Sequence, residues 1–196
     1  MPLYVAVFIS RNKDNKGLPF FKQRCKTVLV RTNNLWDEWN SEDERTYIDL
    51  LTKFQEFVDK GVGDELCRCY VSVNDRNEDK IKKKLLLYLI QNDNYDITKL
   101  DNIINSVSMD PENANHKMWL IDYDDFEDYD KVKDDIHAEA PDEDDFIVSS
   151  YQTVNGYHFV VAHGFDTRKL NQKYGDKLSV KRDGMRLYNW KRKPNQ

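Results

Sequence analysis

The sequence predicts an α+β fold, with a mixed, mainly antiparallel sheet and flanking helices. Strand-like segments rich in Val, Ile, Tyr and Phe are interspersed with segments of helical periodicity. The second half runs in the order β-α-β-β-α-β-β, which favours helices packed on one face of such a sheet. Asn155-Gly156 and Asp183-Gly184 are turn dipeptides typical of β-hairpins. We therefore expect one domain over 1–196, in which 1–110 form the N-terminal part and 111–196 carry the candidate site.

The first half begins with two strands. The expected elements, in the order strand, strand, helix, strand, helix and short helix, are 3–9, 25–32, 41–60, 66–74, 75–93 and 97–107. Ser41 and Glu44 form a capping-box pattern at the start of the first helix, and Gly61 follows its end. The apolar residues between them recur with the spacing of one helical face, so this helix should pack on the sheet.

The second half alternates short strands with short helices. Strands are expected at 118–123, 146–153 and 157–163, helices at 129–137 and 166–174, and two last strands within 177–190. Asn155-Gly156 should join the second and third strands, and Asp183-Gly184 should join the last two as a basic hairpin. A polar loop through Pro141 should precede the second strand.

Charge is unevenly distributed along the chain. The net charge is −5, yet residues 122–145 hold 13 Asp and Glu against 2 Lys, and residues 165–196 hold 10 Lys and Arg against 3 Asp. A basic tail beside an acidic segment suits a polyanion held against metal ions, and equally a solvated tail beside an acidic loop.

The composition also limits the class of protein. No run of about 18 apolar residues occurs, so we expect no membrane span. The first ten residues lack the features of a signal peptide and are interpreted as a strand. Three cysteines argue against a disulfide framework and are expected to be buried thiols in a reducing cytosol.

The stretch "MWLIDYDDF" (118–126) places two acids at the end of an apolar strand. Asp122 and Asp124 are two residues apart, so their side chains should point to the same face, where they repel each other. Carboxylates in this arrangement suit Mg²⁺ or Mn²⁺, which complete their coordination with phosphate oxygens and water. The competing interpretation is that the strand ends at Tyr123 and the acids begin a solvated loop.

The stretch "TVNGYHFVV" (153–161) places a histidine just after a glycine turn. Gly156 would let backbone N–H groups approach an anion, and Thr153 and Asn155 would add polar donors. His158 could then bind a nucleotide phosphate. A histidine on a strand can instead be a purely structural residue.

The basic C-terminal segment offers a third acid. Asp183 lies among Lys181, Arg182 and Arg186 and could complete a metal site, although its place in an Asp-Gly turn explains it equally well. Asp166 is the other candidate, and it also fits a helix N-cap.

A second basic cluster lies between a strand and a helix in the first half. Its members are Arg68, Tyr70, Arg76, Lys80, Lys82, Lys83 and Lys84. Such a cluster could contact template phosphates without reading sequence, with Tyr70 as a stacking platform, or the lysines could form the solvated face of an amphipathic helix.

Taken in order, these motifs resemble those of the archaeo-eukaryotic primase superfamily, which includes primase-polymerases. "LIDYD" resembles the first motif of that family, "NGYHF" its second, and "LSVKRD" is a poor match to its third. The resemblance covers roughly residues 117–190. It implies an RRM-like catalytic sheet in which two divalent ions, Mg²⁺ or Mn²⁺, bridge the carboxylates and an incoming nucleoside triphosphate.

Carried onto this sequence, the resemblance implies a role for each motif residue. Asp122, Asp124 and Asp183 would be metal ligands, and His158 would contact the triphosphate together with Thr153, Asn155, Gly156 and Arg182. Arg68, Arg76, Lys80 and Arg186 would bind nucleic acid. The chemistry would be nucleotidyl transfer on a single-stranded or primed template by a minimal stand-alone core.

The setting expected for such a core is the cytoplasm, in a protein encoded by a phage or plasmid or by its host. A helicase or another replication protein is a candidate partner, and no membrane is involved. Three other functions remain open on the sequence. One is a metal-dependent nuclease, which would have no use for a nucleoside triphosphate. Another is a non-catalytic RRM-like module that binds nucleic acid or protein. The third is a viral inhibitor of a host protein that uses its acidic segment as a nucleic-acid mimic.

Overall fold

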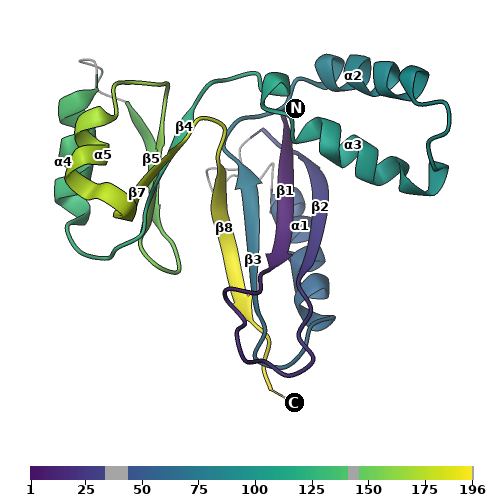
Figure 1. Cartoon of the computed structure of the whole chain (residues 1–196), viewed down its shortest axis with the longest axis horizontal. Coiled ribbons are helices and arrows are strands. Elements are labelled where there is room, and N and C mark those ends of the chain that lie inside the picture. Colours follow the sequence, from purple (N-terminus) through teal and green to yellow (C-terminus); the bar gives the residue numbers. More distant parts are fainter. Residues whose placement is uncertain (34–43, 141–145, 196) are drawn as a thin grey trace.

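The fold is that of a computed structural model, which describes residues 1–33, 44–140 and 146–195. These residues form two antiparallel sheets of four strands each, with helices packed on them, so the expected α+β class is confirmed (Figure 1). Residues 1–110 do not extend the sheet of the second half. They form a sheet of their own, which one C-terminal strand completes.

The first sheet has the strand order β2-β1-β3-β8. Its strands are β1 (Leu3–Ser10), β2 (Arg24–Arg31), β3 (Leu66–Ser72) and β8 (Met185–Arg192). Helix α1 (Glu44–Asp59) covers one face, where Phe54 packs against Phe8 with ring centroids 5.4 Å apart. The expected cap residue Ser41 lies outside the described residues.

The second sheet has the strand order β5-β6-β4-β7. Its elements, in chain order, are β4 (Trp119–Tyr123), α4 (Tyr129–Glu139), β5 (Ile147–Gln152), β6 (Tyr157–Val161), α5 (Arg168–Tyr174) and β7 (Leu178–Lys181). This is the β-α-β-β-α-β topology expected for an RRM-like half. Both helices cover one face of the sheet, over a core that includes Ile121, Phe159 and Ile136 (Figure 1).

A helical hairpin connects the two sheets. Helix α2 (Glu78–Gln91) and helix α3 (Leu100–Ser108) pack against each other and project beside the first sheet (Figure 1). Short 3-10 turns, Ile97–Lys99 and Pro111–Asn113, precede and follow α3. None of the helices in the described parts of the chain is both long and apolar enough to cross a membrane.

The expected hairpin at Asp183-Gly184 is wrong. β7 pairs with β4 in the second sheet, whereas β8 pairs with β3 in the first, so this dipeptide carries the chain from one sheet to the other. Long-range contacts determine this path. Asp183 is bound by Asn74 and Arg76, and a Cβ added at Gly184 would lie 2.5 Å from the Cβ of Leu120, so the link must pass close to β4.

The hairpin at Asn155-Gly156 is confirmed, since β5 and β6 pair antiparallel up to Gln152 and Tyr157. The connection spans 153–156, in which the N–H of Thr153 donates to the carbonyl of Gly156 (2.7 Å). It is therefore a four-residue loop, longer than the two-residue turn that the dipeptide favours.

Candidate active site: a cleft between two sheets

Each sheet has one face covered by helices, and the other faces meet across a cleft of about 440 Å³. The first sheet and the loop after β1 contribute Val7, Ile9, Arg11, Lys13, Arg68, Tyr70, Met185 and Leu187. The second sheet and its loops contribute Asp122, Asp124, Thr153, Asn155, His158, Ser179 and Lys181. The cleft thus carries carboxylates on the second sheet, cations mainly on the first, and apolar side chains from β1 and β8.

Asp122 is the most strongly held acid in the cleft. Its Oδ1 lies 3.0 Å from Nε2 of His158, and its Oδ2 lies 2.5 Å from Nζ of Lys181. Burial alone would raise the pKa of Asp122, but the hydrogen bond from His158 and the ammonium of Lys181 outweigh it. The pKa therefore lies well below its ordinary value, and the carboxylate is ionised at neutral pH.

The backbone determines which nitrogen of His158 carries a proton. The N–H of Leu187 donates to Nδ1 of His158 (3.2 Å), which needs a lone pair on that nitrogen. Nε2 then carries the ring proton and points it at Asp122. Both ring nitrogens are engaged and the side chain is 5% exposed, so His158 orients Asp122. Its expected contact with a triphosphate stays a prediction.

Asp124 follows directly after β4 and lines the same cleft as Asp122, as the Asp-x-Asp spacing predicts. Its N–H donates to the carbonyl of Lys177 (2.7 Å), which continues the pairing of β4 with the segment leading into β7. The side chain is exposed, and its carboxylate has no hydrogen bond or ion pair with the described residues. One acid of the pair is thus neutralised within the protein, and the other faces solvent.

Gly156 brings the β5–β6 loop against the chain that carries these acids. A Cβ at Gly156 would lie 2.0 Å from the carbonyl oxygen of Tyr123 and 2.5 Å from the backbone nitrogen of Asp125. The N–H groups of Gly156 and Asn155 both point to Oγ1 of Thr153 (3.1 and 3.4 Å). The role of this glycine is close packing, and its N–H already has an acceptor.

The basic side of the cleft is built on one buried carboxylate. Asp14 accepts from Nε of Arg11 at 2.7 Å and from Nη2 of Arg68 at 2.8 Å. Arg68 lies on β3 with only 7% of its side chain exposed, so its guanidinium is held in place. Lys13 adds a further cation from the same loop.

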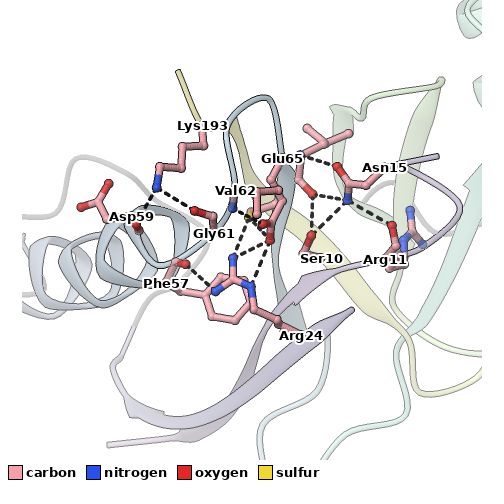
Figure 2. A network of polar contacts seen from close by, with 12 residues as sticks. Ser10, Arg11, Asn15, Arg24, Phe57, Asp59, Gly61, Val62, Glu65 and Lys193 are labelled. Atoms are coloured by element: carbon pink, nitrogen blue, oxygen red, sulfur yellow. Dashed lines mark hydrogen bonds and ion pairs between the residues drawn. The ribbon is translucent and has the colours of Figure 1, made fainter. Parts of the chain in front are cut away.

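The loop that carries Arg11 and Asp14 is fastened to β3 by Asn15. Its Nδ2 donates to Oγ of Ser10 and to the carbonyls of Arg11 and Leu66, and its Oδ1 accepts from the N–H of Leu66 (Figure 2). An amide that makes four bonds at distances of 2.6–3.1 Å leaves this loop little freedom.

A buried ion pair continues this network away from the cleft. Glu65 is 1% exposed and binds Nε and Nη2 of Arg24, whose Nη1 donates to the carbonyl of Phe57 (Figure 2). Lys193 binds the carbonyls of Asp59 and Gly61. These contacts join β2, the end of α1, β3 and the C-terminal segment, and so support the sheet beneath the basic side.

Several residues predicted for the site lie elsewhere. Asp183 is not among the residues that line the cleft. Its Oδ2 binds Nη1 of Arg76 at 2.8 Å and its Oδ1 accepts from Asn74 at 3.0 Å, so both oxygens are engaged. Asp166, the other candidate, forms a surface pair with Arg168. The structure brings neither acid to Asp122 and Asp124.

The predicted cationic residues separate in a similar way. Arg182 stacks over Trp119 outside the cleft, and Lys80, which lies on helix α2, binds the carbonyl of Glu112. Arg186 lies between the rings of Tyr151 and Tyr188, with its guanidinium carbon 5.1 and 5.0 Å from their centroids. Of the four residues predicted to bind nucleic acid, only Arg68 lines the cleft. Tyr70, which was considered as a stacking platform, also lines it.

Three cations of the cleft were missed as site residues from the sequence. Arg11 and Lys13 lie in a polar loop that carries no motif, and Lys181 was noted only as part of a basic segment. The sequence held one indication of Lys181: it lies two residues before Asp183, which was wrongly predicted to be a metal ligand. Its side chain and that of Asp122 share a face because Asp122 pairs with Ser179 and Leu120 with Lys181.

The acidic pair fits the preferences of a hard divalent ion, since the cleft offers carboxylate oxygens and no thiolate. Over 1–33, 44–140 and 146–195, no three His, Cys, Asp or Glu side chains gather as a ready-made metal site. An ion held by Asp122 and Asp124 would therefore take its other ligands from water and from phosphate oxygens, as Mg²⁺ commonly does.

Comparison with protein families, curated proteins and solved structures finds no match to this chain. The resemblance to primase-polymerases therefore rests on the short motifs of the sequence alone. What the chain does has to be inferred from the geometry of the cleft.

Proposed function

We propose that the cleft binds a nucleoside triphosphate together with Mg²⁺ or Mn²⁺ and transfers its nucleotidyl group to a nucleic acid. One observation carries this proposal. Two acids on one sheet face a cluster of cations held mainly by the other sheet, across a cleft that apolar side chains also line. The triphosphate of a nucleotide is a polyanion that both metal ions and basic side chains attract. Its base can pack against apolar side chains.

Each side of the cleft has a role in this proposal. Asp122 and Asp124 would hold the metal, and His158 keeps Asp122 oriented. Arg11, Lys13 and Arg68 would neutralise the phosphates. The metal, when bound, supplies activation of the attacking 3′-hydroxyl and charge neutralisation on the phosphates. The rigid Arg11–Asp14–Arg68 cluster favours catalysis by positioning, since its cations need no rearrangement to meet the phosphates.

A non-catalytic RRM-like module that binds nucleic acid is the second candidate, and a specific contact favours it. Lys181 already neutralises Asp122, so the cleft is electrostatically satisfied without metal on that side. In this case the cations of the cleft would bind a phosphate backbone, and the aspartates would weaken that binding by repulsion.

The test is calorimetric binding of Mn²⁺ with a nucleoside triphosphate. Asp124→Asn is the informative variant, since Asp124 lines the cleft and makes no side-chain contact with described residues. Asp125→Asn is the matched control, because Asp125 pairs with Lys177 outside the cleft. We expect Asp124→Asn to lose metal-dependent nucleotide binding and Asp125→Asn to retain it.

Other results would separate the alternatives. Nucleotide binding that is equal in both variants, or absent from folded wild type, would overturn the proposal. Mn²⁺-dependent cleavage of single-stranded nucleic acid without triphosphate binding would indicate a nuclease. Nucleic-acid binding that is unchanged or tighter in Asp124→Asn, without nucleotide binding, would indicate the non-catalytic module. If nucleotide binds, primer extension on a single-stranded template is the direct assay of activity.

A further inference from the structure

Lys181 occupies the position at Asp122 where a metal ion would have to bind. Its Nζ lies 2.5 Å from Oδ2 of Asp122, while His158 holds the other oxygen. A divalent ion and an ammonium on the same Oδ2 repel each other at close range, so the two cations compete for that oxygen.

Lys181 is able to move, unlike the two arginines of the cleft, Arg11 and Arg68. It is the last residue of β7, its side chain is 47% exposed, and lysine has a long flexible stem. Arg11 and Arg68, in contrast, are both held by the buried Asp14. When Lys181 leaves Asp122, its ammonium remains within the same cleft, next to the space that phosphates would occupy.

We propose that Lys181 is an exchangeable counter-ion, which a divalent metal displaces from Asp122 and which then binds a phosphate of the nucleotide. This inference rests on the proposed function, because it requires metal and nucleotide to share the cleft. It assigns to Lys181 the role of a positioning residue that couples the two ligands. The metal binds weakly alone because it must break the ion pair, and the nucleotide lowers that cost by receiving the ammonium.

The exchange has a signature that a purely structural ion pair lacks. Removal of the ammonium takes away the competitor of the metal and also takes away a ligand of the phosphate. Affinity for metal alone therefore rises, while affinity for nucleotide in the presence of metal falls. Because linkage is reciprocal, the factor by which nucleotide tightens metal binding must fall as well.

The experiment compares Lys181→Met with Lys177→Met by titration calorimetry with Mn²⁺ alone and then with ATP at saturating Mn²⁺. Methionine keeps most of the apolar stem and removes the charge. Lys177 is a close control, since its Nζ lies 2.5 Å from Oδ2 of Asp125 and it does not line the cleft. For Lys181→Met we expect Mn²⁺ to bind about fivefold tighter and ATP about tenfold weaker. For Lys177→Met we expect wild-type values.

Lys181→Arg supplies a second comparison that does not depend on the behaviour of the methionine variant. A guanidinium binds a carboxylate with two parallel hydrogen bonds and is harder to displace than an ammonium. Mn²⁺ alone should therefore bind more weakly to Lys181→Arg than to wild type, whereas ATP affinity at saturating Mn²⁺ should be retained.

Unchanged or weaker Mn²⁺ binding in Lys181→Met would overturn the exchange, and so would tighter Mn²⁺ binding in Lys181→Arg. Equal shifts in the Lys181 and Lys177 variants would also overturn it, since they would reflect a general change in charge. A different result would overturn the proposed function itself, namely a folded wild-type protein that binds neither Mn²⁺ nor ATP. That result would remove both proposals.

Discussion

Replacing Gly156 with alanine tests how the β5–β6 loop is held against the acidic segment. The added Cβ would meet three backbone atoms of the chain after β4, namely the carbonyl oxygen of Tyr123 at 2.0 Å and the nitrogen and carbonyl oxygen of Asp125 at 2.5 and 2.7 Å. Such atoms cannot rotate away as a side chain can. The loop and the segment must separate by about 1 Å to reach even 3.0 Å, the limit that real Cβ atoms respect.

This separation sets the expected loss of stability. Overpacking of a close-packed site costs about 1–3 kcal/mol, and three rigid contacts place Gly156→Ala near the upper end. Alanine also lowers the conformational entropy of the unfolded chain, which offsets about 0.5 kcal/mol of this loss of stability. We therefore expect the free energy of unfolding to fall by about 2 kcal/mol relative to wild type.

The assay is equilibrium unfolding in urea, with Asn155→Ala as the matched control. Asn155 is the exposed neighbour in the same loop, so its replacement should change the free energy of unfolding by less than about 0.5 kcal/mol. A Gly156→Ala protein as stable as the control, with an unchanged m-value, would refute the close packing of the loop against Tyr123 and Asp125.

Three further predictions follow from other contacts. Asp183→Ala leaves Arg76 buried without its partner, so it should lower the free energy of unfolding by about 3–5 kcal/mol and leave Mn²⁺ binding unchanged, as urea unfolding and calorimetry would measure. The pKa of Asp122 is lower in the folded protein than in the unfolded chain. The ionised carboxylate therefore stabilises the fold fully at pH values above the pKa of the unfolded chain, and this contribution is lost as the pH falls through the pKa of the folded protein. The stability advantage of wild type over Asp122→Asn should thus be full above about pH 5 and shrink toward pH 2 in acid titrations of unfolding. Burial raises the pKa of the Cys67 and Cys69 thiols on β3 to about 12, whereas Cys25 is exposed, so the prediction of buried cysteines is wrong for Cys25. An aromatic disulfide reagent should therefore label Cys25 alone in native protein and all three thiols in denaturant.

Local patterns were enough to predict the helices and strands of the second half up to residue 181. The alternation of strands and helices from 118 to 181 depends on turn residues and on the spacing of apolar residues, and both are properties of neighbouring positions. The expected helix at 129–137 is observed as Tyr129–Glu139, and the expected strand at 118–123 as Trp119–Tyr123. The Asp-x-Asp spacing likewise predicted that Asp122 and Asp124 would point to the same face, and both line one cleft.

Pairings between distant segments could not be predicted in this way. Asp183 and Arg76 are 107 residues apart, and a turn dipeptide carries no information about such a partner. The hairpin prediction failed at Asp183-Gly184 because the alternative, a crossing between sheets, is stabilised by contacts far away in the sequence. The basic cluster at 68–84 dispersed for a similar reason. Arg68 lies on β3 and lines the cleft, whereas Arg76 lies in the link after β3 and binds Asp183. Lys80 lies on α2 and binds the carbonyl of Glu112.

The repulsion between Asp122 and Asp124 is relieved unequally, and this inequality bears on function. Two like charges on one strand face repel each other, and solvent alone relieves this repulsion only in part. Here Lys181 and His158 hold Asp122, and Asp124 is exposed in the same cleft. This arrangement suits a site that exchanges ligands, with one carboxylate kept in place by a replaceable cation and the other open to an incoming ion. The Lys181 and Asp124 variants therefore test two parts of one hypothesis, since the first alters the replaceable cation and the second the open ligand.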